Sequence, residues 1–295
     1  MSSSVVARPR AGRVRGNERT RGNSRTRGNT MTHVVLVVAS LLMIFPFVWQ
    51  ILMSLATNAQ VTSVPPTVWP GTLHFENFAH VFDQLPFLNQ LWVSVAVTVI
   101  RTVGQLLLCS MAGYAFARME FPFRRTIFAL VLAILMVPPQ VYLLPQYQIV
   151  QGLGWLNTIA GIAAPGIFSA FGTFLMRQFF LDIPDDLLDA ARIDGLGEFA
   201  IFRRVALPLV RPALAALAIL VFLGNWTAFL WPLIATTAPE HYTLPVGLAS
   251  LQGEFQTDWA MIMTGSALAT FPTLLVFLLL QRHIVNGIAL TGLKA

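Results

Sequence analysis

Long apolar blocks alternate with short polar connections along the 295 residues of this chain. A stretch of about 20 mostly apolar residues is long enough to cross a bilayer as an α-helix. An amphipathic helix on a soluble core would instead carry one polar face. The pattern therefore predicts an all-α membrane protein with six transmembrane helices. The predicted spans are 31–53, 87–117, 126–149, 158–177, 212–236 and 259–281.

Composition agrees with this pattern, because 56% of the residues are hydrophobic and only 11% are charged. Soluble domains carry about 25% charged residues. The first block begins only at Met31, is longer than the apolar region of a signal peptide and lacks a clear cleavage site, so we expect a retained span. The single cysteine, Cys109, excludes an internal disulfide and a cysteine-cluster metal site.

Basic residues occupy alternate connections between the predicted spans. Eight arginines fall in the first 30 residues, and others lie between spans two and three, between spans four and five, and after span six. The connections 54–86, 150–157 and 237–258 contain no lysine or arginine. Because positive residues stay on the cytoplasmic side, we predict that the N- and C-termini are both cytoplasmic.

Residues 1–30 form a separate segment of Arg-Gly-Asn repeats, followed by a membrane domain over 31–295. The segment has too little apolar surface to fold, so we predict a disordered cytoplasmic tail that helps to set topology. Contact with anionic lipid would add about 1 kcal/mol for each arginine close to the surface. Arg-Gly segments also bind nucleic acid in other proteins, although we expect no nucleic-acid partner here.

The most polar stretch of the membrane domain, 189–208, falls on the predicted cytoplasmic side. Pro184 and the two aspartates after it are typical of a helix start. Gly195 suits the left-handed position that ends a helix, and a second short helix is expected from about Gly197. Pro208 should limit that second helix. The prediction is a helix, a glycine turn and a helix outside the lipid.

Two interpretations of this stretch remain open from its side chains. Ala190, Ala191 and Gly195 are small, so another backbone could approach closely. Large apolar side chains on a connection either mark a contact surface or pack against the protein's own spans. The large apolar residues here are Phe199, Ile201 and Phe202.

The same stretch resembles the EAA loop of permease subunits in binding-protein-dependent ABC importers. The family pattern is Glu-Ala-Ala, three residues, Gly, nine residues and Ile-x-Leu-Pro. This chain has Asp-Ala-Ala at 189–191, then Gly195, then Val-Ala-Leu-Pro at 205–208. Asp for Glu and Val for Ile keep charge and shape. The resemblance implies an EAA loop at about 182–208.

Further stretches resemble the carbohydrate-uptake group, in particular the second permease of maltose-type importers, over residues 31–295. They lie at 115–118, 121–123, 136–139, 172–177, 230–232, 244–247 and 281–294. The resemblance implies a six-span permease in a bacterial inner membrane that moves a sugar or sugar derivative, phosphorylated ones included. The implied partners are a homologous second permease, two ATPase subunits, an extracytoplasmic binding protein and the lipid bilayer.

In this family the EAA loop docks on a separate ATPase subunit. The coupling residues that carry over, or fall within the pattern, are Asp189, Ala190, Ala191, Gly195, Leu207 and Pro208. A P-loop requires a lysine that reaches the phosphates, whereas the only lysine here is Lys294. We therefore expect no cofactor and no catalysis in this chain, with ATP and Mg²⁺ on the partner ATPase subunits.

Three residues are candidates for the substrate pathway. Sugars present hydroxyls and flat apolar faces, which Asn225 and Trp226 of the fifth span can contact; ordinary helix packing is the alternative. Arg101 lies inside the second span, where a charge is costly and requires a partner. Three partners remain open for Arg101: the second permease, a backbone carbonyl or an anionic substrate. The alternative to a role in the substrate pathway is structural, with Arg101 paired between helices or snorkelling towards the membrane surface.

Two rival classes have weaker support. A secondary transporter driven by an ion gradient often carries an acidic residue at mid-membrane depth, and none of the 13 acidic residues is securely placed there. A membrane-bound enzyme would need a site that the sequence does not provide. His74 with Glu76, and His80 with Asp83, do not match a zinc spacing, so we predict no metal site.

Overall fold

The structure is a computed structural model that describes residues 22–65, 67–253 and 257–291. Its described part is helical and contains no β-strand, which confirms the all-α class. The chain divides into two compact units, Met1–Trp49 and Gln50–Ala295, which we describe separately. Residues 1–21 of the predicted tail and Lys294 lie outside the described residues, so disorder of residues 1–21 stays a prediction; residues 22–30 belong to α1, so disorder predicted there is wrong.

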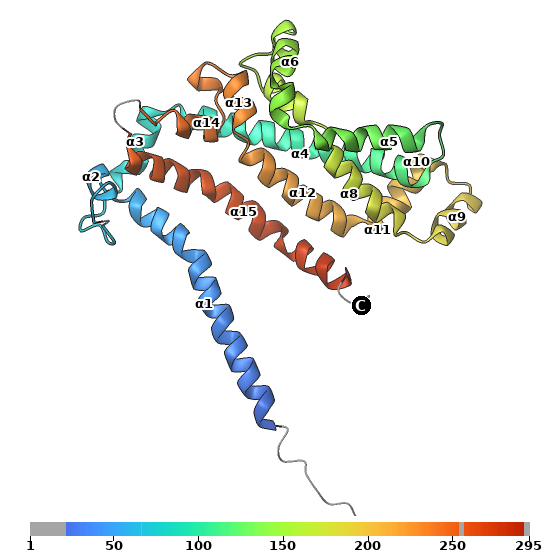
Figure 1. The fold of residues 1–295 in the computed structure, drawn as a ribbon, viewed down its shortest axis with the longest axis horizontal. Helices are drawn as coiled ribbons and strands as arrows, with labels where there is room; N and C mark the ends of the chain where they lie inside the picture. The colour runs from blue at the N-terminus through green and yellow to red at the C-terminus, as the bar shows by residue number, and fades with distance from the viewer. Residues whose placement is uncertain (1–21, 66, 254–256, 292–295) are drawn as a thin grey trace, which may run out of the picture. The chain divides into compact units, whose positions relative to one another are not determined.

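The first unit consists mainly of α1 (Gly22–Ser54; Figure 1). The residues of α1 from Gln50 onward are counted in the second unit. The part of α1 from Thr30 to Ser54 is apolar and long enough to cross a membrane. The side chains from Met31 to Phe47 are exposed. A helix that is hydrophobic all round needs either a protein core or lipid around it, and this segment agrees with the first predicted span.

The second unit is built around α4 (Phe87–Arg118), with α8 and α12 packed on it and α15 packed on α12 (Figure 1). The remaining helices precede α4 in the chain or lie in the connections between these four helices. In chain order the remaining bounds are α2 Asn58–Val61, α3 Glu76–Gln84, α5 Arg124–Ala133, η1 Ile134–Met136, α6 Pro139–Gly152, α7 Ile159–Ala163, η2 Ala164–Gly166, α8 Ala170–Leu181, α9 Asp185–Ile193, α10 Glu198–Ile201, η3 Phe202–Ala206, α11 Leu207–Leu209, α12 Arg211–Trp226, α13 Leu230–Ala235, η4 Pro239–His241, α14 Leu244–Ala249 and α15 Trp259–Thr291.

Three helical stretches are long and apolar enough to cross a membrane unbroken, and three bent pairs pass the same test together. The described residues therefore contain up to six spans if each bent pair is one span. The bends measure 102° between α5–η1 and α6, 45° between α7–η2 and α8, and 80° between α10–α11 and α12. Hydropathy located these segments but did not predict that they bend.

Prolines explain where the helices break. α6 begins at Pro139 directly after Pro138, and Pro165 lies in η2. The predicted span 212–236 is not a single helix: α12 ends at Trp226, and α13 starts only at Leu230. Pro232 has no N–H and its ring crowds the carbonyl four residues earlier, which is that of Ala228 in the break between α12 and α13.

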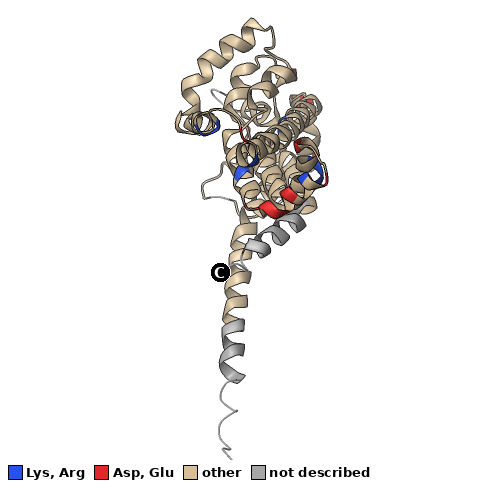
Figure 2. Cartoon of the chain, turned by 90° about the vertical axis from the view of Figure 1, so that its right-hand side faces the viewer, with Lys and Arg blue, Asp and Glu red and all other residues tan. Residues whose placement is uncertain are grey.

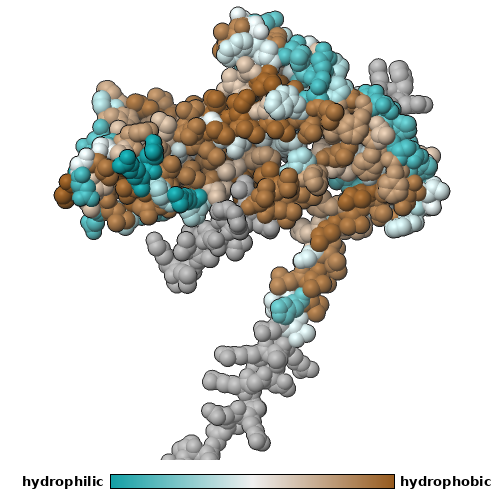
Figure 3. Space-filling view, turned by 180° about the vertical axis from the view of Figure 1, so that it is seen from behind, coloured by the Kyte–Doolittle hydropathy of each residue, from teal (hydrophilic) through white to brown (hydrophobic). Residues whose placement is uncertain are grey.

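One of three buried clusters of the second unit lies between α4, α8, α12 and the loop that follows α8. Gly113 of α4 permits the close approach, since a Cβ there would lie 2.8 Å from the Cβ of Met176 on α8. Figure 3 shows hydrophobic residues along the middle of this unit and hydrophilic residues towards its ends. This distribution suits a protein whose middle lies in lipid.

Candidate coupling loop and membrane-interior polar contacts

The polar stretch forms the predicted helix, glycine turn and helix. α9 ends in a Schellman motif, in which Gly195 donates its N–H to the Arg192 carbonyl at 3.0 Å and Leu196 donates to the Ala191 carbonyl at 3.1 Å. Gly195 has a φ of +82°, so its predicted left-handed conformation is confirmed. α10 follows with Gly197 at its N-cap, which confirms the start of the second helix.

Pro208 lies near the end of the second helix, which stops at Leu209, so the prediction that it limits this helix is confirmed. The helical path continues through η3, a π-helical turn, into α11, and turns only at Val210 before α12. Pro208 lies in the first turn of α11, where its missing N–H removes no helical hydrogen bond. The wider π turn before it accommodates the ring.

The inner face of this loop packs on the protein's own spans. Phe202 lies against Tyr114 of α4, with ring centroids 5.2 Å apart, and Tyr114 meets Phe180 of α8 edge-on at 5.5 Å. Ile201 is fully buried in the same cluster. Phe199 is 66% exposed. Ile201 and Phe202 therefore pack against the protein's own spans, whereas Phe199 faces outward, as expected of a contact surface.

Charged groups fix the two helices of the loop against each other. Arg192 donates to Asp189 at 2.7 Å and to Glu198 at 3.1 Å, and the Tyr114 hydroxyl donates to Glu198 at 3.0 Å. The hydrogen bond to Asp189, followed by the one to Glu198, raises the pKa of Arg192. Exposed ion pairs of this kind contribute only about 0–1 kcal/mol each, so their main effect is on geometry.

Arg118 anchors the start of the loop. Its guanidinium donates to the carbonyls of Phe180 at 2.9 Å and Leu181 at 3.1 Å, and also to the Ile183 carbonyl and the Asp185 carboxylate. A cation at a helix C-terminus is favourable because the carbonyls there are unsatisfied. Sequence reasoning used Arg118 as a topology signal and as part of the family resemblance, and missed this role.

The outer face of the loop is open. Ile193 is 87% exposed, and a Cβ on Gly195 would have no atom within 4 Å. Asp189 and Ala190 are also exposed, whereas Ala191 faces the core and the predicted coupling residues Leu207 and Pro208 are half-buried. Figure 2 views this end of the chain, where charged residues gather. The loop thus combines a rigidly attached inner face with an apolar, uncovered outer face.

Arg101 and Asn225 lie together in the interior. Arg101 donates from Nε to the Ala163 carbonyl at 3.2 Å and from Nη1 to Asn225 Oδ1 at 3.4 Å. One turn further along α4, Gln105 donates to the Gly166 carbonyl at 2.6 Å. The break between α7 and α8 leaves carbonyls without helical partners, and α4 supplies two donors for them. Among the described residues, Arg101 has no carboxylate partner.

Trp226 packs against α15. Its indole N–H donates to the Ala269 carbonyl at 3.1 Å, its ring stacks on Phe222 at 5.9 Å between centroids, and it is 6% exposed. These contacts are those of ordinary helix packing, which was the alternative to a place in the substrate pathway. Trp231, five residues later, is also buried and donates to the Gly161 carbonyl at 3.2 Å.

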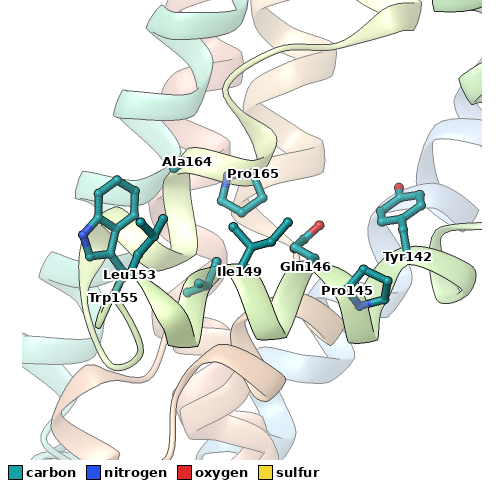
Figure 4. Close-up of a pocket in the computed structure, with 9 residues that line it drawn as sticks. Tyr142, Pro145, Gln146, Ile149, Leu153, Trp155, Ala164 and Pro165 are labelled. Atoms are coloured by element: carbon teal, nitrogen blue, oxygen red, sulfur yellow. The ribbon is translucent and has the colours of Figure 1, made fainter.

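A groove of about 450 Å³ lies between α6, the loop after it and η2 (Figure 4). The rings of Tyr142, Trp155 and Pro165 and the amide of Gln146 contribute to its lining. Sequence reasoning missed this groove, because residues on α6 and η2 come together only through the bends in spans three and four.

The histidine side chains of the first connection lie beside acidic residues that follow them closely in the chain. His74 lies 2.6 Å from Glu76, and His80 lies 3.8 Å from Asp83. The hydrogen bond with His74 lowers the pKa of Glu76. In the part of the chain that the structure describes, no three His, Cys, Asp or Glu side chains are grouped to hold a metal ion.

Comparison with known proteins identifies the family. Residues 105–289 match the family described as binding-protein-dependent transport system inner membrane component. The chain belongs to this family. It is a permease subunit of a binding-protein-dependent ABC importer, of the carbohydrate-uptake group, as the resemblance over residues 31–295 predicted.

Relatives and a solved structure resemble the permease over most of its length. The arabinooligosaccharides transport system permease protein AraQ of Bacillus subtilis is 36% identical over 86% of this chain and 92% of the relative. The sn-glycerol-3-phosphate permease protein UgpE of Brucella abortus is 34% identical over 88% and 95%. The crystal structure of a bacterial ABC transporter for alginate import matches the fold with a TM-score of 0.74, at 22% identity, over 88% of this chain and 98% of that one.

Proposed function

We propose that the permease forms the translocation path for a sugar or sugar derivative and couples it to a separate ATPase through α9 and α10. The coupling role is supported by one observation, which is that the two faces of the loop differ. Its inner face is fixed to α4 and α8 by Phe202 and Arg118, while its outer face presents Phe199 and Ile193 to a partner. An exposed apolar group on an otherwise packed loop is typical of a protein contact.

The proposed orientation places α9, α10 and both termini in the cytoplasm of a bacterial cell, with the spans in the inner membrane. The proposed assembly contains this permease, a homologous second permease, two ATPase subunits and an extracytoplasmic binding protein. ATP and Mg²⁺ belong to the ATPase subunits in this proposal. The permease itself carries out no chemistry and binds no cofactor.

The chemistry of the interior favours a neutral sugar over a phosphorylated one. AraQ is named for arabinooligosaccharides and UgpE for sn-glycerol-3-phosphate, so the relatives span both classes. Arg101 donates to the Ala163 carbonyl and to Asn225, which gives it a structural role that needs no anionic substrate. The groove beside α6 offers what a sugar ring needs, because it combines aromatic faces with the Gln146 amide.

Reconstitution tests this proposal against an ion-gradient-driven transporter. The permease is purified from native membranes and its co-purifying subunits are identified. The assembled complex is then placed in vesicles with labelled arabinooligosaccharide and with labelled glycerol phosphate. We expect a co-purifying ATPase and sugar uptake that stops when ATP is removed. Uptake that needs only an ion gradient, with no ATPase bound, would refute the proposal.

A further inference from the structure

A second feature lies outside the coupling loop, at the point where α4 ends and α5 begins. A cavity of about 220 Å³ is lined by three arginines and two phenylalanines from α4, α5 and α8. A neighbouring cavity of about 390 Å³ shares two of the arginines. The five lining residues are Phe116, Arg124, Arg125, Phe128 and Arg177. We call this group the basic pocket.

The basic pocket concentrates positive charge that the described chain does not neutralise. Arg124 and Arg125 are the first two residues of α5, whose first turn contains no acidic residue. The partial positive charge of a helix N-terminus adds to theirs. The described residues place no carboxylate within ion-pair distance of these two or of Arg177. Glu120 lines only the neighbouring cavity.

The guanidinium groups are positioned by contacts of their own. Arg124 donates to the Met119 carbonyl at 2.8 Å, and Arg177 donates to the Phe116 carbonyl at 3.2 Å. The Arg177 guanidinium also lies 4.5 Å from the centroid of the Phe128 ring, a cation–π contact. The pocket is therefore partly pre-organised, with donors left over for an anion.

Exposed apolar side chains on α5 and on the turn before it form an apolar border close to the basic pocket, and Phe123 among them lines the neighbouring cavity. Phe123, which precedes α5, is 78% exposed in a left-handed conformation with φ of +60°. Ile127 and Leu130 of α5 are 41% and 64% exposed. Because α4 and α5 belong to candidate spans that end here, the pocket lies where lipid headgroups meet acyl chains. A soluble anion would gain nothing from this apolar border.

We propose that the basic pocket binds the phosphodiester headgroup of an anionic phospholipid, whose acyl chains lie along Phe123, Ile127 and Leu130. The arginines match a phosphate in charge and hydrogen-bonding geometry. The proposal rests on the proposed function only in placing this end of the spans at the cytoplasmic surface. It is independent of the substrate and of coupling, so lipid retention and sugar uptake can fail separately.

The test measures lipids retained by the purified importer complex in nanodiscs of equal parts phosphatidylcholine and phosphatidylglycerol. The variant is Arg124→Gln with Arg125→Gln, and Arg177→Gln is a second, milder variant. The matched control is Arg203→Gln with Arg204→Gln, because those exposed neighbours line neither cavity. Native mass spectrometry counts bound phosphatidylglycerol, and thermal unfolding with and without that lipid reports binding independently.

We expect retained phosphatidylglycerol to fall about fivefold for each arginine neutralised near the surface, and not in the control. The double variant should also lose the thermal stabilisation that phosphatidylglycerol gives to the wild type. Equal loss in the control, or no loss in either variant, would overturn the proposal. Displacement by inorganic phosphate would assign the pocket to a soluble anion instead. Loss of the ATPase subunits with the lipid retained would assign it to a protein contact.

Discussion

Gly195→Leu isolates the outer face of the coupling loop. Gly195 has a φ of +82°, and a Cβ added there would meet no atom within 4 Å. The substitution therefore leaves the chain's own packing intact and adds only backbone strain and an exposed isobutyl group. An L-residue in the left-handed region costs about 1–2 kcal/mol. The loop should tolerate that cost, because Phe202 and Arg118 hold its inner face.

A short series separates strain from bulk. Gly195→Ala introduces most of the strain with little volume, whereas Gly195→Asn adds volume with less strain, because Asn tolerates the left-handed region. The matched control is Gly154→Leu, since Gly154 has a φ of +69° and equally open surroundings but lies in another loop. We expect Gly195→Leu and Gly154→Leu to lower thermal stability similarly.

The deciding assay is substrate-stimulated ATP hydrolysis by the reconstituted complex, normalised to assembled permease. If the outer face docks on an ATPase, Gly195→Leu should reduce the stimulated rate at least about tenfold, which is about 1.4 kcal/mol of coupling. Gly195→Asn should reduce it less; Gly154→Leu serves only as the control for thermal stability, because its loop borders the groove proposed for the sugar. Full stimulation by correctly assembled Gly195→Leu would refute the docking role.

Three further changes give separate tests. Arg101→Met should destabilise the permease by about 1–3 kcal/mol, because the buried Ala163 carbonyl loses its donor; labelled neutral and phosphorylated sugars should be affected alike, and selective loss of the phosphorylated one would contradict a structural role. Tyr114→Phe removes the donor to Glu198 and should cost about 1 kcal/mol in thermal unfolding; an unchanged melting temperature would argue against this contact. Deleting residues 2–28 should leave uptake largely intact at normal membrane abundance, whereas complete loss would show that the tail is needed.

The coupling loop was predictable because its signals are local. A glycine at the end of an amphipathic helix and another at the next N-cap specify turns from a few neighbouring residues. The orientation of its side chains was not predictable in the same way. Nothing in the sequence near Phe199 and Phe202 distinguishes them, yet one is exposed and the other meets Tyr114, which lies in a helix far earlier in the chain.

The bends in the spans were not predictable from hydropathy, because a broken apolar helix is as hydrophobic as a straight one. Prolines mark possible breaks, but whether a break is tolerated depends on distant donors. At η2 the donors are Arg101 and Gln105, about 60 positions earlier. The basic pocket was missed for the same reason, since Arg177 reaches Arg124 and Arg125 only through packing of α8 beside α5.

Helix α4 connects the coupling loop to the broken spans. At one end, Tyr114 and Arg118 hold the loop through the aromatic cluster and the α8 carbonyls. Near its middle, Arg101 and Gln105 hold the break at η2. Burial of one phenylalanine such as Phe202 is worth about 1.5–3 kcal/mol, more than the exposed ion pairs of the loop provide. Displacing the loop alone would sacrifice that packing, whereas displacing it together with α4 and α8 preserves it. We therefore expect the loop, α4 and α8 to move together when a partner displaces the outer face, and the hydrogen bonds from Arg101 and Gln105 join α4 to the break at η2.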